Sequence, residues 1–245
     1  MKKTAFILFL LSAFAMSAQA AEPLRIAIFG DSYSTFQGHM SPAINECWYP
    51  HNPNNDVKEV EQTWWWQVID RMGATLVQNN SYSGSTIGFY GYRRAQENQN
   101  DGHSWKTSRA DFSPRSFIAR AVNLGDSIGA PELLLVLAGT NDSWTGAEDG
   151  PYQWGNWTRE DLFKTRPALA RLCHDLKELY PDTRILFILN TELTPAFNES
   201  LHTITRYYGL ECLDLHDIHK QSNHPSQQGM KAIADQVVEY LSQGK

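Results

Sequence analysis

Leu24-Arg25-Ile26-Ala27-Ile28-Phe29 runs directly into Gly30-Asp31-Ser32-Tyr33-Ser34 near the start of the chain. The apolar run ends in a glycine, which predicts a buried strand that breaks into a tight turn. Ligands of open parallel sheets bind beyond the carboxyl ends of the strands, and a helix beginning just after this turn would aim its N–H groups there. We therefore expect Ser32 to stand where a nucleophile is needed, although a lone Gly-Asp-Ser is more often an ordinary Asx-capped turn.

Apolar runs and helical segments alternate along the rest of the chain. The run 133–138, Leu-Leu-Leu-Val-Leu-Ala, suits a central parallel strand that is buried on both faces. The alternation implies right-handed crossovers and a parallel sheet of about five strands covered by helices. Strands are expected at 24–29, 74–79, 133–138, 184–190 and 210–215, and helices at 63–72, 115–124, 158–180, 195–208 and 226–241.

Capping residues mark several of the expected helices. Thr63 and Gly73 bracket the first helix, and Thr158 with Asp161 forms a capping box before a helix in which Pro167 suggests a kink. Two segments lack a clear period. Residues 36–60 are rich in Pro, Asn and His and are interpreted as a long surface excursion, and residues 88–115 as a loop beside the site.

The first twenty residues have the pattern of a secretory signal peptide. Lys2 and Lys3 precede an apolar stretch too short to span a bilayer, and Ala18-Gln19-Ala20 is a small-x-small cleavage site. We expect residues 1–20 to be removed and residues 21–245 to form a single domain that is soluble outside the cytoplasm, periplasmic or extracellular. No later apolar run is long enough for a membrane span.

The net charge of the chain narrows the class of partner. The chain carries 27 acidic and 21 basic residues, a formal net charge of −6, and loss of Lys2 and Lys3 makes it more negative. This balance argues against nucleic acid or an anionic membrane as the partner.

Three cysteines give no readable disulfide framework or zinc motif, and two of them are expected to be packed core residues. The three are Cys47, Cys173 and Cys212, of which the last two are the expected core residues.

Four of the expected turns carry the groups that acyl transfer at a serine needs. Ser32 can supply the nucleophile and one backbone N–H, and Gly84, in the turn after the second strand, another N–H. Asn141 follows the third strand with a side-chain amide, and His224, in the loop before the last helix, can act as the base. A glycine at position 84 would let its backbone approach the substrate closely.

With these blocks in this order, the chain resembles the SGNH hydrolases of the GDSL lipase/esterase superfamily. The matching segments are Gly30-Asp31-Ser32-Tyr33-Ser34, Gly84, Gly139-Thr140-Asn141-Asp142 and His224-Pro225-Ser226-Gln227-Gln228-Gly229-Met230. The resemblance implies a flavodoxin-like three-layer α/β/α sandwich with strand order 2-1-3-4-5. It also implies ester hydrolysis through an acyl-enzyme on Ser32, with catalytic Ser32 and His224, oxyanion donors from Ser32, Gly84 and Asn141, and no metal or organic cofactor.

One position departs from the family pattern. The family usually has Asp three residues before the histidine, to orient its ring, whereas this chain has Gln221. Loss of the orienting acid in a triad protease costs about 10⁴-fold in turnover, so something must replace it. The sequence leaves three candidates: the backbone carbonyl of Gln221, which we place first, Asp217 in the same loop, and Glu192 after the fourth strand.

Eight tryptophans suggest stacking surfaces as well as core. We expect Trp64, Trp65 and Trp66 to pack in the core. We leave Trp144, Trp154 and Trp157 open between packing and binding of sugar rings or aryl groups.

The first functional hypothesis is an exported esterase that removes acetyl or another small acyl group from carbohydrate or related substrates. The alternative is a non-catalytic carbohydrate-binding protein on the same scaffold. A flavodoxin-like nucleotide binder is disfavoured, because Asp31 would repel an anion at the first turn.

Overall fold

The computed structural model describes residues 22–93, 106–108 and 111–243. Its centre is a five-stranded sheet in which every neighbouring pair is parallel. The strands are β1 (Arg25–Gly30), β2 (Thr75–Asn79), β5 (Leu133–Leu137), β6 (Arg184–Leu189) and β7 (Glu211–Asp214). Their order is β2-β1-β5-β6-β7, which confirms the predicted order 2-1-3-4-5, since these are the first to fifth strands of the sheet along the chain.

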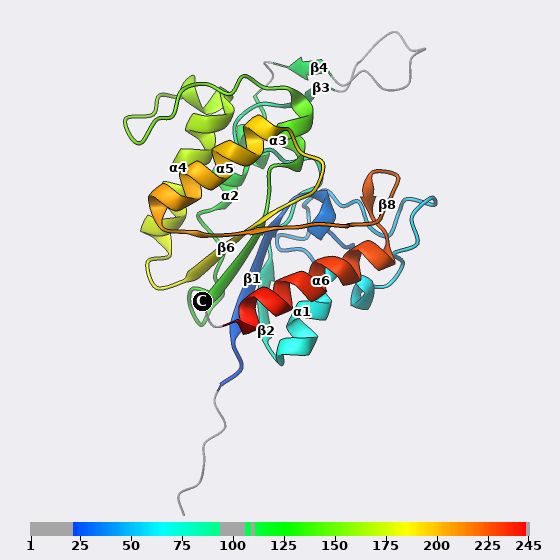
Figure 1. Ribbon diagram of the computed structural model, residues 1–245. Coiled ribbons are helices and arrows are strands. Elements are labelled where there is room, and N and C mark those ends of the chain that lie inside the picture. The colour runs from blue at the N-terminus through cyan, green and yellow to red at the C-terminus, as the bar shows by residue number, and fades with distance from the viewer. Residues whose placement is uncertain (1–21, 94–105, 109–110, 244–245) are drawn as a thin grey trace, which may run out of the picture.

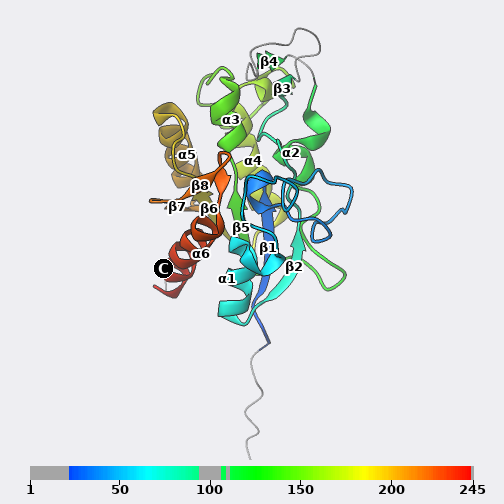
Figure 2. The ribbon, with the colours of Figure 1, turned by 90° about the vertical axis from the view of Figure 1, so that its right-hand side faces the viewer.

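Helices cover both faces of this sheet. One face packs against α1 (Trp64–Met72) and α6 (Gln227–Ser242), and the other against α2 (Phe117–Arg120), α4 (Thr165–Leu179) and α5 (Pro195–Tyr208) (Figures 1 and 2). The predicted three-layer sandwich is therefore confirmed.

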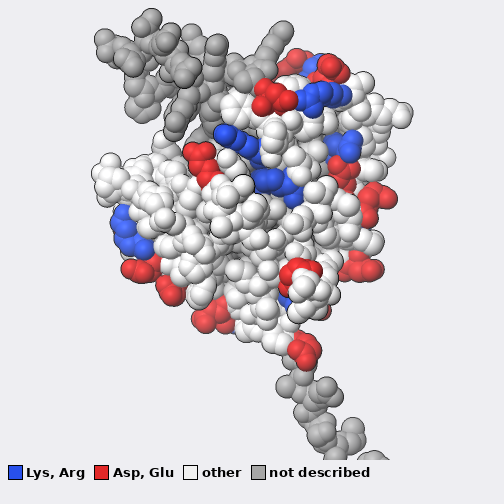
Figure 3. Space-filling model, turned by 180° about the vertical axis from the view of Figure 1, so that it is seen from behind, with Lys and Arg blue, Asp and Glu red and all other residues white. Residues whose placement is uncertain are grey.

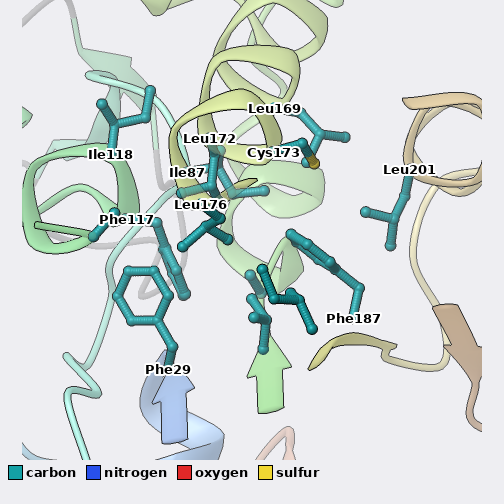
Figure 4. Packing of buried hydrophobic residues seen from close by; sticks show 14 of the residues in the cluster. Phe29, Ile87, Phe117, Ile118, Leu169, Leu172, Cys173, Leu176, Phe187 and Leu201 are labelled. Atoms are coloured by element: carbon teal, nitrogen blue, oxygen red, sulfur yellow. The ribbon is translucent and has the colours of Figure 1, made fainter. Parts of the chain in front are cut away.

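The strand β1 shows how the sequence builds two cores at once. Successive side chains of a strand point to opposite faces, so Ile26 and Ile28 enter the core under α1 and α6. Ala27 and Phe29 enter the core under α2, α4 and α5. Phe29 packs there beside Phe117, with ring centroids 4.7 Å apart (Figure 4). All five residues of β5 are buried, as the continuous apolar run predicts.

The predicted caps define several helix ends. The Thr63 hydroxyl accepts the N–H of Trp66 at the start of α1, and Gly73 ends that helix at φ 58°. Gly209 ends α5 at φ 65°. At the start of α6 the Ser226 hydroxyl accepts the Gly229 N–H at 3.2 Å. Because these caps are local, their position could be predicted from the sequence alone.

Two helices differ from the expectation. Thr158 and Asp161 do bond to each other, but Asp161 begins a 3₁₀ turn, η4 (Asp161–Phe163), and the chain is extended at Lys164 before α4 begins. The helix expected at 115–124 has only the four residues of α2, after a 3₁₀ turn, η3 (Ser113–Arg115). Its continuation is diverted, because the N–H of Leu124 donates to the Tyr180 hydroxyl at 2.9 Å.

The segments around the site also differ from their prediction. No α-helix follows Ser32; a single 3₁₀ turn, η1 (Ser32–Ser34), leads into extended chain. Residues 36–60 are more than a surface excursion, because Tyr49 and Val57 are fully buried against the α1 face before the 3₁₀ turn η2 (Val60–Gln62). Within the expected loop 88–115 lies a hairpin of β3 (Gly91–Arg93) and β4 (Lys106–Ser108), and an unexpected helix, α3 (Thr140–Thr145), follows β5.

The expected export and the expected lack of a nucleic-acid partner concern the signal peptide and the surface of the protein. The predicted signal peptide lies outside the described residues. In the part of the chain that the structure describes, no helix has the length and apolar character that a membrane crossing requires. On the face in Figure 3, Lys and Arg are interspersed with Asp and Glu, so the described residues there form no continuous basic surface. Export and the lack of a nucleic-acid partner stay predictions.

Candidate active site

The first turn of the site raises Ser32 from the end of β1. Asp31 caps this turn, its carboxylate accepting the Tyr33 N–H at 3.0 Å. Gly30 is required because a Cβ there would lie 2.4 Å from the Ser34 hydroxyl and 2.8 Å from that of Ser81. The short turn therefore folds tightly against the neighbouring loop, and Ser32 keeps only 6% of its surface exposed.

The second turn, after β2, stays attached to β1 beyond the end of the regular strand. The N–H of Asn80 donates to Ile28 at 2.8 Å, and that of Tyr82 to Gly30 at 3.1 Å. This pairing carries Gly84 to the end of the sheet at which Ser32 lies. Gly84 has φ 77°, and a Cβ would meet no atom within 4 Å. The left-handed backbone favours glycine at this position, and the close approach of its backbone to a substrate stays a prediction.

The third turn, after β5, begins with Gly139 and places Asn141 at the start of α3. Gly139 has φ 99°, and a Cβ would overlap the Phe197 ring, so only glycine fits. Asn141 is buried, and its side-chain amide donates to the Ser85 carbonyl at 2.8 Å, one residue beyond Gly84. This bond ties the second turn to the third. Asp142 next to it is structural, accepting the Ile87 N–H at 2.9 Å and the Tyr90 hydroxyl at 2.6 Å.

The fourth turn supplies His224 from a two-residue hairpin between β8 (Lys220–Gln221) and β9 (His224–Pro225). Ser222 and Asn223 both have positive φ, 50° and 61°, as the central residues of a type I′ hairpin turn do. The imidazole Nε2 of His224 lies 2.8 Å from the Ser32 hydroxyl oxygen. Its Nδ1 lies 3.0 Å from the Ser222 carbonyl oxygen. Because a carbonyl only accepts, Nδ1 carries the proton and Nε2 is left to accept from Ser32.

The partner of Nδ1 corrects the sequence-based ranking of its three candidates. A backbone carbonyl does face the ring, but it belongs to Ser222 and not to Gln221. The Gln221 side chain instead bonds Asp56, accepting its N–H at 2.9 Å. Asp217 is exposed beside His216, and Glu192 pairs with Lys220 at 3.0 Å. None of the three candidates contacts the His224 ring through a hydrogen bond in the described structure.

Burial sets the charge of His224. Removal of the ring from water lowers its pKa to about 4, against the raising effect of the Ser222 carbonyl and with a further lowering by the Lys220 ammonium. The imidazole is therefore neutral at pH 7, the state in which Nε2 can accept a proton.

Trp48 is a site residue that the sequence analysis missed. Its indole stacks on the His224 imidazole with ring centroids 3.7 Å apart and an interplanar angle of 8°. The segment around it crosses the site, since the Glu46 carbonyl accepts the Ser83 N–H at 2.8 Å, next to Gly84. No sequence signal distinguishes Trp48 from the other tryptophans, because the contact joins residues 176 positions apart.

Arg120 is a second residue that the sequence did not indicate, and its hydrogen bonds connect the first two turns. Its guanidinium donates to the Gly30 carbonyl at 3.4 Å and to the Ser85 hydroxyl at 3.0 Å. The Phe29 and Phe117 rings flank it at 4.9 and 4.6 Å. Burial lowers the pKa of Arg120 to about 9 and raises that of Asp31 to about 7, while each charge partly offsets the effect on the other.

The other described tryptophans and the three cysteines have varied surroundings. Trp64 and Trp65 are fully buried, and Trp66 is partly buried against the same core. Trp154 stacks on Tyr207 with centroids 4.0 Å apart, Trp157 packs beside His174, and Trp144 is 40% exposed. Cys173 is buried, Cys47 and Cys212 are half-buried, and all three are free thiols.

Two other features include neither Ser32 nor His224. A cavity of about 190 Å³ lies between α3 and α5, and its lining includes Asp142 but neither Ser32 nor His224. Among the described residues, ligand atoms of His202, Cys212 and Asp214 lie within 4.8 Å of one another, at α5 and β7. The absence of a metal or organic cofactor from the reaction stays a prediction.

Comparison with known proteins covers almost the whole described chain. The family model of GDSL-like lipase/acylhydrolase matches residues 24–241. The structure of a GDSL-like lipase from Bacteroides uniformis ATCC 8492 is 47% identical, with a TM-score of 0.81, covering 90% of this chain and 96% of that one. A GDSL-like lipase from Bacteroides ovatus ATCC 8483 is 39% identical, with a TM-score of 0.81 and coverages of 91% and 100%.

More distant structures share the fold alone. A carbohydrate esterase whose active site displays divergent catalytic and non-catalytic binding functions is 18% identical, with a TM-score of 0.62, covering 93% of this chain and 67% of that one. No curated protein is significantly similar in sequence.

Proposed function

Because the chain belongs to the GDSL-like lipase/acylhydrolase family and is an ester hydrolase, we propose that it is an exported serine esterase. It removes acetyl or another small acyl group from carbohydrate or related esters, through an acyl-enzyme on Ser32. The observation that carries this proposal is the distance of 2.8 Å between the Ser32 hydroxyl and Nε2 of neutral His224.

The proposed reaction has two proton-balanced halves. His224 Nε2 takes the Ser32 proton as Oγ attacks the ester carbonyl, and the resulting imidazolium gives that proton to the leaving alcohol. Water then attacks the acyl-enzyme, with Nε2 as the base again, and the acid leaves as the Ser32 proton is restored. Throughout, the Ser222 carbonyl accepts the Nδ1–H and keeps Nε2 facing Ser32.

The oxyanion of each tetrahedral intermediate needs donors that are already in place. We assign these to the backbone N–H groups of Ser32 and Gly84 and to the Asn141 amide. The support is structural: the β1–β2 pairing brings the first two turns together, and the Asn141 bond to Ser85 attaches the third.

Burial of Ser32 and His224 supports the small acyl group of this proposal. Ser32 and His224 are only 6% and 9% exposed, which suits a small acyl group better than a long chain. The carbohydrate part of the proposal is motivated by the fold that the chain shares with a carbohydrate esterase.

The direct experiment measures p-nitrophenol release from p-nitrophenyl acetate and from longer-chain esters, then acetate release from acetylated oligosaccharides. Wild type should hydrolyse p-nitrophenyl acetate faster than the longer-chain esters. Ser32→Ala should abolish release, and the control Ser242→Ala, at the far end of α6, should behave as wild type. Equal rates in wild type and Ser32→Ala would remove the nucleophile assignment. Binding of the oligosaccharide without hydrolysis would favour the non-catalytic alternative.

Export is tested by expressing the chain with and without residues 1–20. The proposal requires the full chain to reach the periplasm or medium in a form shortened by about 20 residues, as signal-peptide cleavage leaves it. Retention of both forms in the cytoplasm would contradict it.

A further inference from the structure

His224 lacks the partner that usually stabilises its charged form. After Nε2 takes the Ser32 proton the ring is an imidazolium, which in the Ser-His-Asp arrangement is stabilised and oriented by a carboxylate. In the described part of the chain no carboxylate hydrogen-bonds His224; its Nδ1 meets the neutral Ser222 carbonyl, and the nearby charge of Lys220 opposes protonation. A carbonyl alone fixes one point of the ring and leaves its plane to be set by other contacts.

The indole of Trp48 stacks on one face of the ring. It lies nearly parallel to the imidazole, at an angle of 8° and a centroid distance of 3.7 Å. An aromatic face carries negative potential, so a cation held within about 6 Å of its centre is stabilised, most strongly by tryptophan and away from water.

Trp48 is held in register with the nucleophile as well as with the base. Its backbone N–H donates to the Thr35 hydroxyl at 3.0 Å, and that hydroxyl donates to the Ser32 carbonyl at 3.0 Å. The next residue, Tyr49, is buried, and its hydroxyl donates to the Pro225 carbonyl at 2.8 Å, beside His224. The backbone that carries the indole is thereby attached both to the Ser32 turn and to the segment that follows His224.

We propose that Trp48 is a positioning residue that takes over the two tasks of the missing carboxylate. It holds the imidazole plane so that Nδ1 meets Ser222 and Nε2 meets Ser32, and it stabilises the imidazolium through its π face. This inference rests on the proposed esterase mechanism and extends it to the residue that compensates for Gln221.

Other groups around His224 do not supply this function. Tyr33 and Tyr49 face the ring at centroid distances of 5.1 and 6.2 Å, but their planes are tilted by 54° and 78°. Burial raises the pKa of both phenols, so they stay neutral. Lys220 is cationic and disfavours the imidazolium.

Kinetics of matched variants separate an aromatic role from simple covering of the site. Trp48→Phe keeps a π face and should retain kcat within about threefold. Trp48→Leu keeps apolar cover without a π face and should lower kcat about 10-fold, equal to about 1.4 kcal/mol, with little change in KM. Trp157→Leu, a control beside His174, should leave both unchanged. Equal kcat for the Phe and Leu variants would overturn the inference.

A second measurement does not depend on hydrolysis. In the Ser32→Ala background, ¹⁵N spectra of the His224 ring at pH 7 report its tautomer whether or not the protein is an esterase. The Nδ1–H form should dominate with Trp48 or Trp48→Phe, and a mixture of tautomers should arise with Trp48→Leu. An unchanged Nδ1–H form in the Leu variant would show that Trp48 does not hold the ring. If Ser32→Ala retains full esterase activity while the tautomer depends on Trp48 as described, the proposed function fails and the positioning role stands.

Discussion

The acid limb of the pH–rate profile tests the buried, neutral state of His224. The profile of kcat/KM against pH reports the pKa of the base in the free enzyme. Burial holds this pKa at about 4, below its usual value. At pH 5 a base of pKa 4 is about 90% neutral, whereas an ordinary histidine is about 3% neutral. Activity at pH 5 should therefore stay close to its value at pH 7. With an ordinary histidine as the base, activity would instead fall roughly 25-fold between pH 7 and pH 5.

The assay is hydrolysis of p-nitrophenyl acetate between pH 3.5 and 8, read at a wavelength where the product's absorbance does not change with pH. Asp31, whose pKa burial raises to about 7, can add a second inflection in this range. Asp31→Asn removes that inflection and should leave the acid limb in place. A single midpoint near 6.5 in both proteins would refute the assignment of a buried, neutral His224 as the base.

Three further predictions concern the residues around the pair. Asn141→Ala should lower kcat by about 10²- to 10³-fold, the cost of losing one oxyanion donor; activity within a few-fold of wild type would reduce Asn141 to a turn residue. Gln221→Ala, Asp217→Asn and Glu192→Gln should each change kcat by less than about fivefold, because losses of 10³ or more are typical of a true third member; such a loss in one carboxylate variant would identify it as the orienting acid. Ionised Asp31 destabilises the fold, since its raised pKa keeps it protonated up to pH 7 while the unfolded chain ionises near pH 4. Asp31→Asn should therefore raise the free energy of unfolding at pH 8, by as much as about 4 kcal/mol, and much less at pH 4; urea unfolding at both values measures this, and an equal gain at the two would contradict it.

The sheet and most helix ends could be predicted because their causes are local. Five short runs with clustered apolar residues predicted the strands of the central sheet, and only the run at 133–138 is continuously apolar. Thr63, Gly73, Gly209 and Ser226 act within one turn of their helix ends. The failures are equally physical. The helix expected to reach residue 124 is cut short by Tyr180, a residue far along the chain, whose hydroxyl competes for the Leu124 N–H.

The site was predictable in its residue types but not in its supporting contacts. Topology predicts that the four site residues approach one edge of the sheet, because three of them follow strands and the fourth lies in the loop before the last helix. These residues are Ser32, Gly84, Asn141 and His224. The Ser222 carbonyl could not be identified, because it faces the ring only through a left-handed turn at two residues that are not glycine. The roles of Trp48 and Arg120 arise from contacts between distant segments, which no local pattern encodes.

The central claim, that Ser32 becomes acylated with His224 as its base, is tested most directly by covalent labelling. Incubation with diethyl p-nitrophenyl phosphate, followed by peptide mass spectrometry, should show one diethylphosphoryl group, located on Ser32. The His224→Ala variant should acquire it at least about 10³-fold more slowly, since nucleophile and base act as a unit. A label on another residue, or equal labelling of Ser32 in the two proteins, would contradict the account.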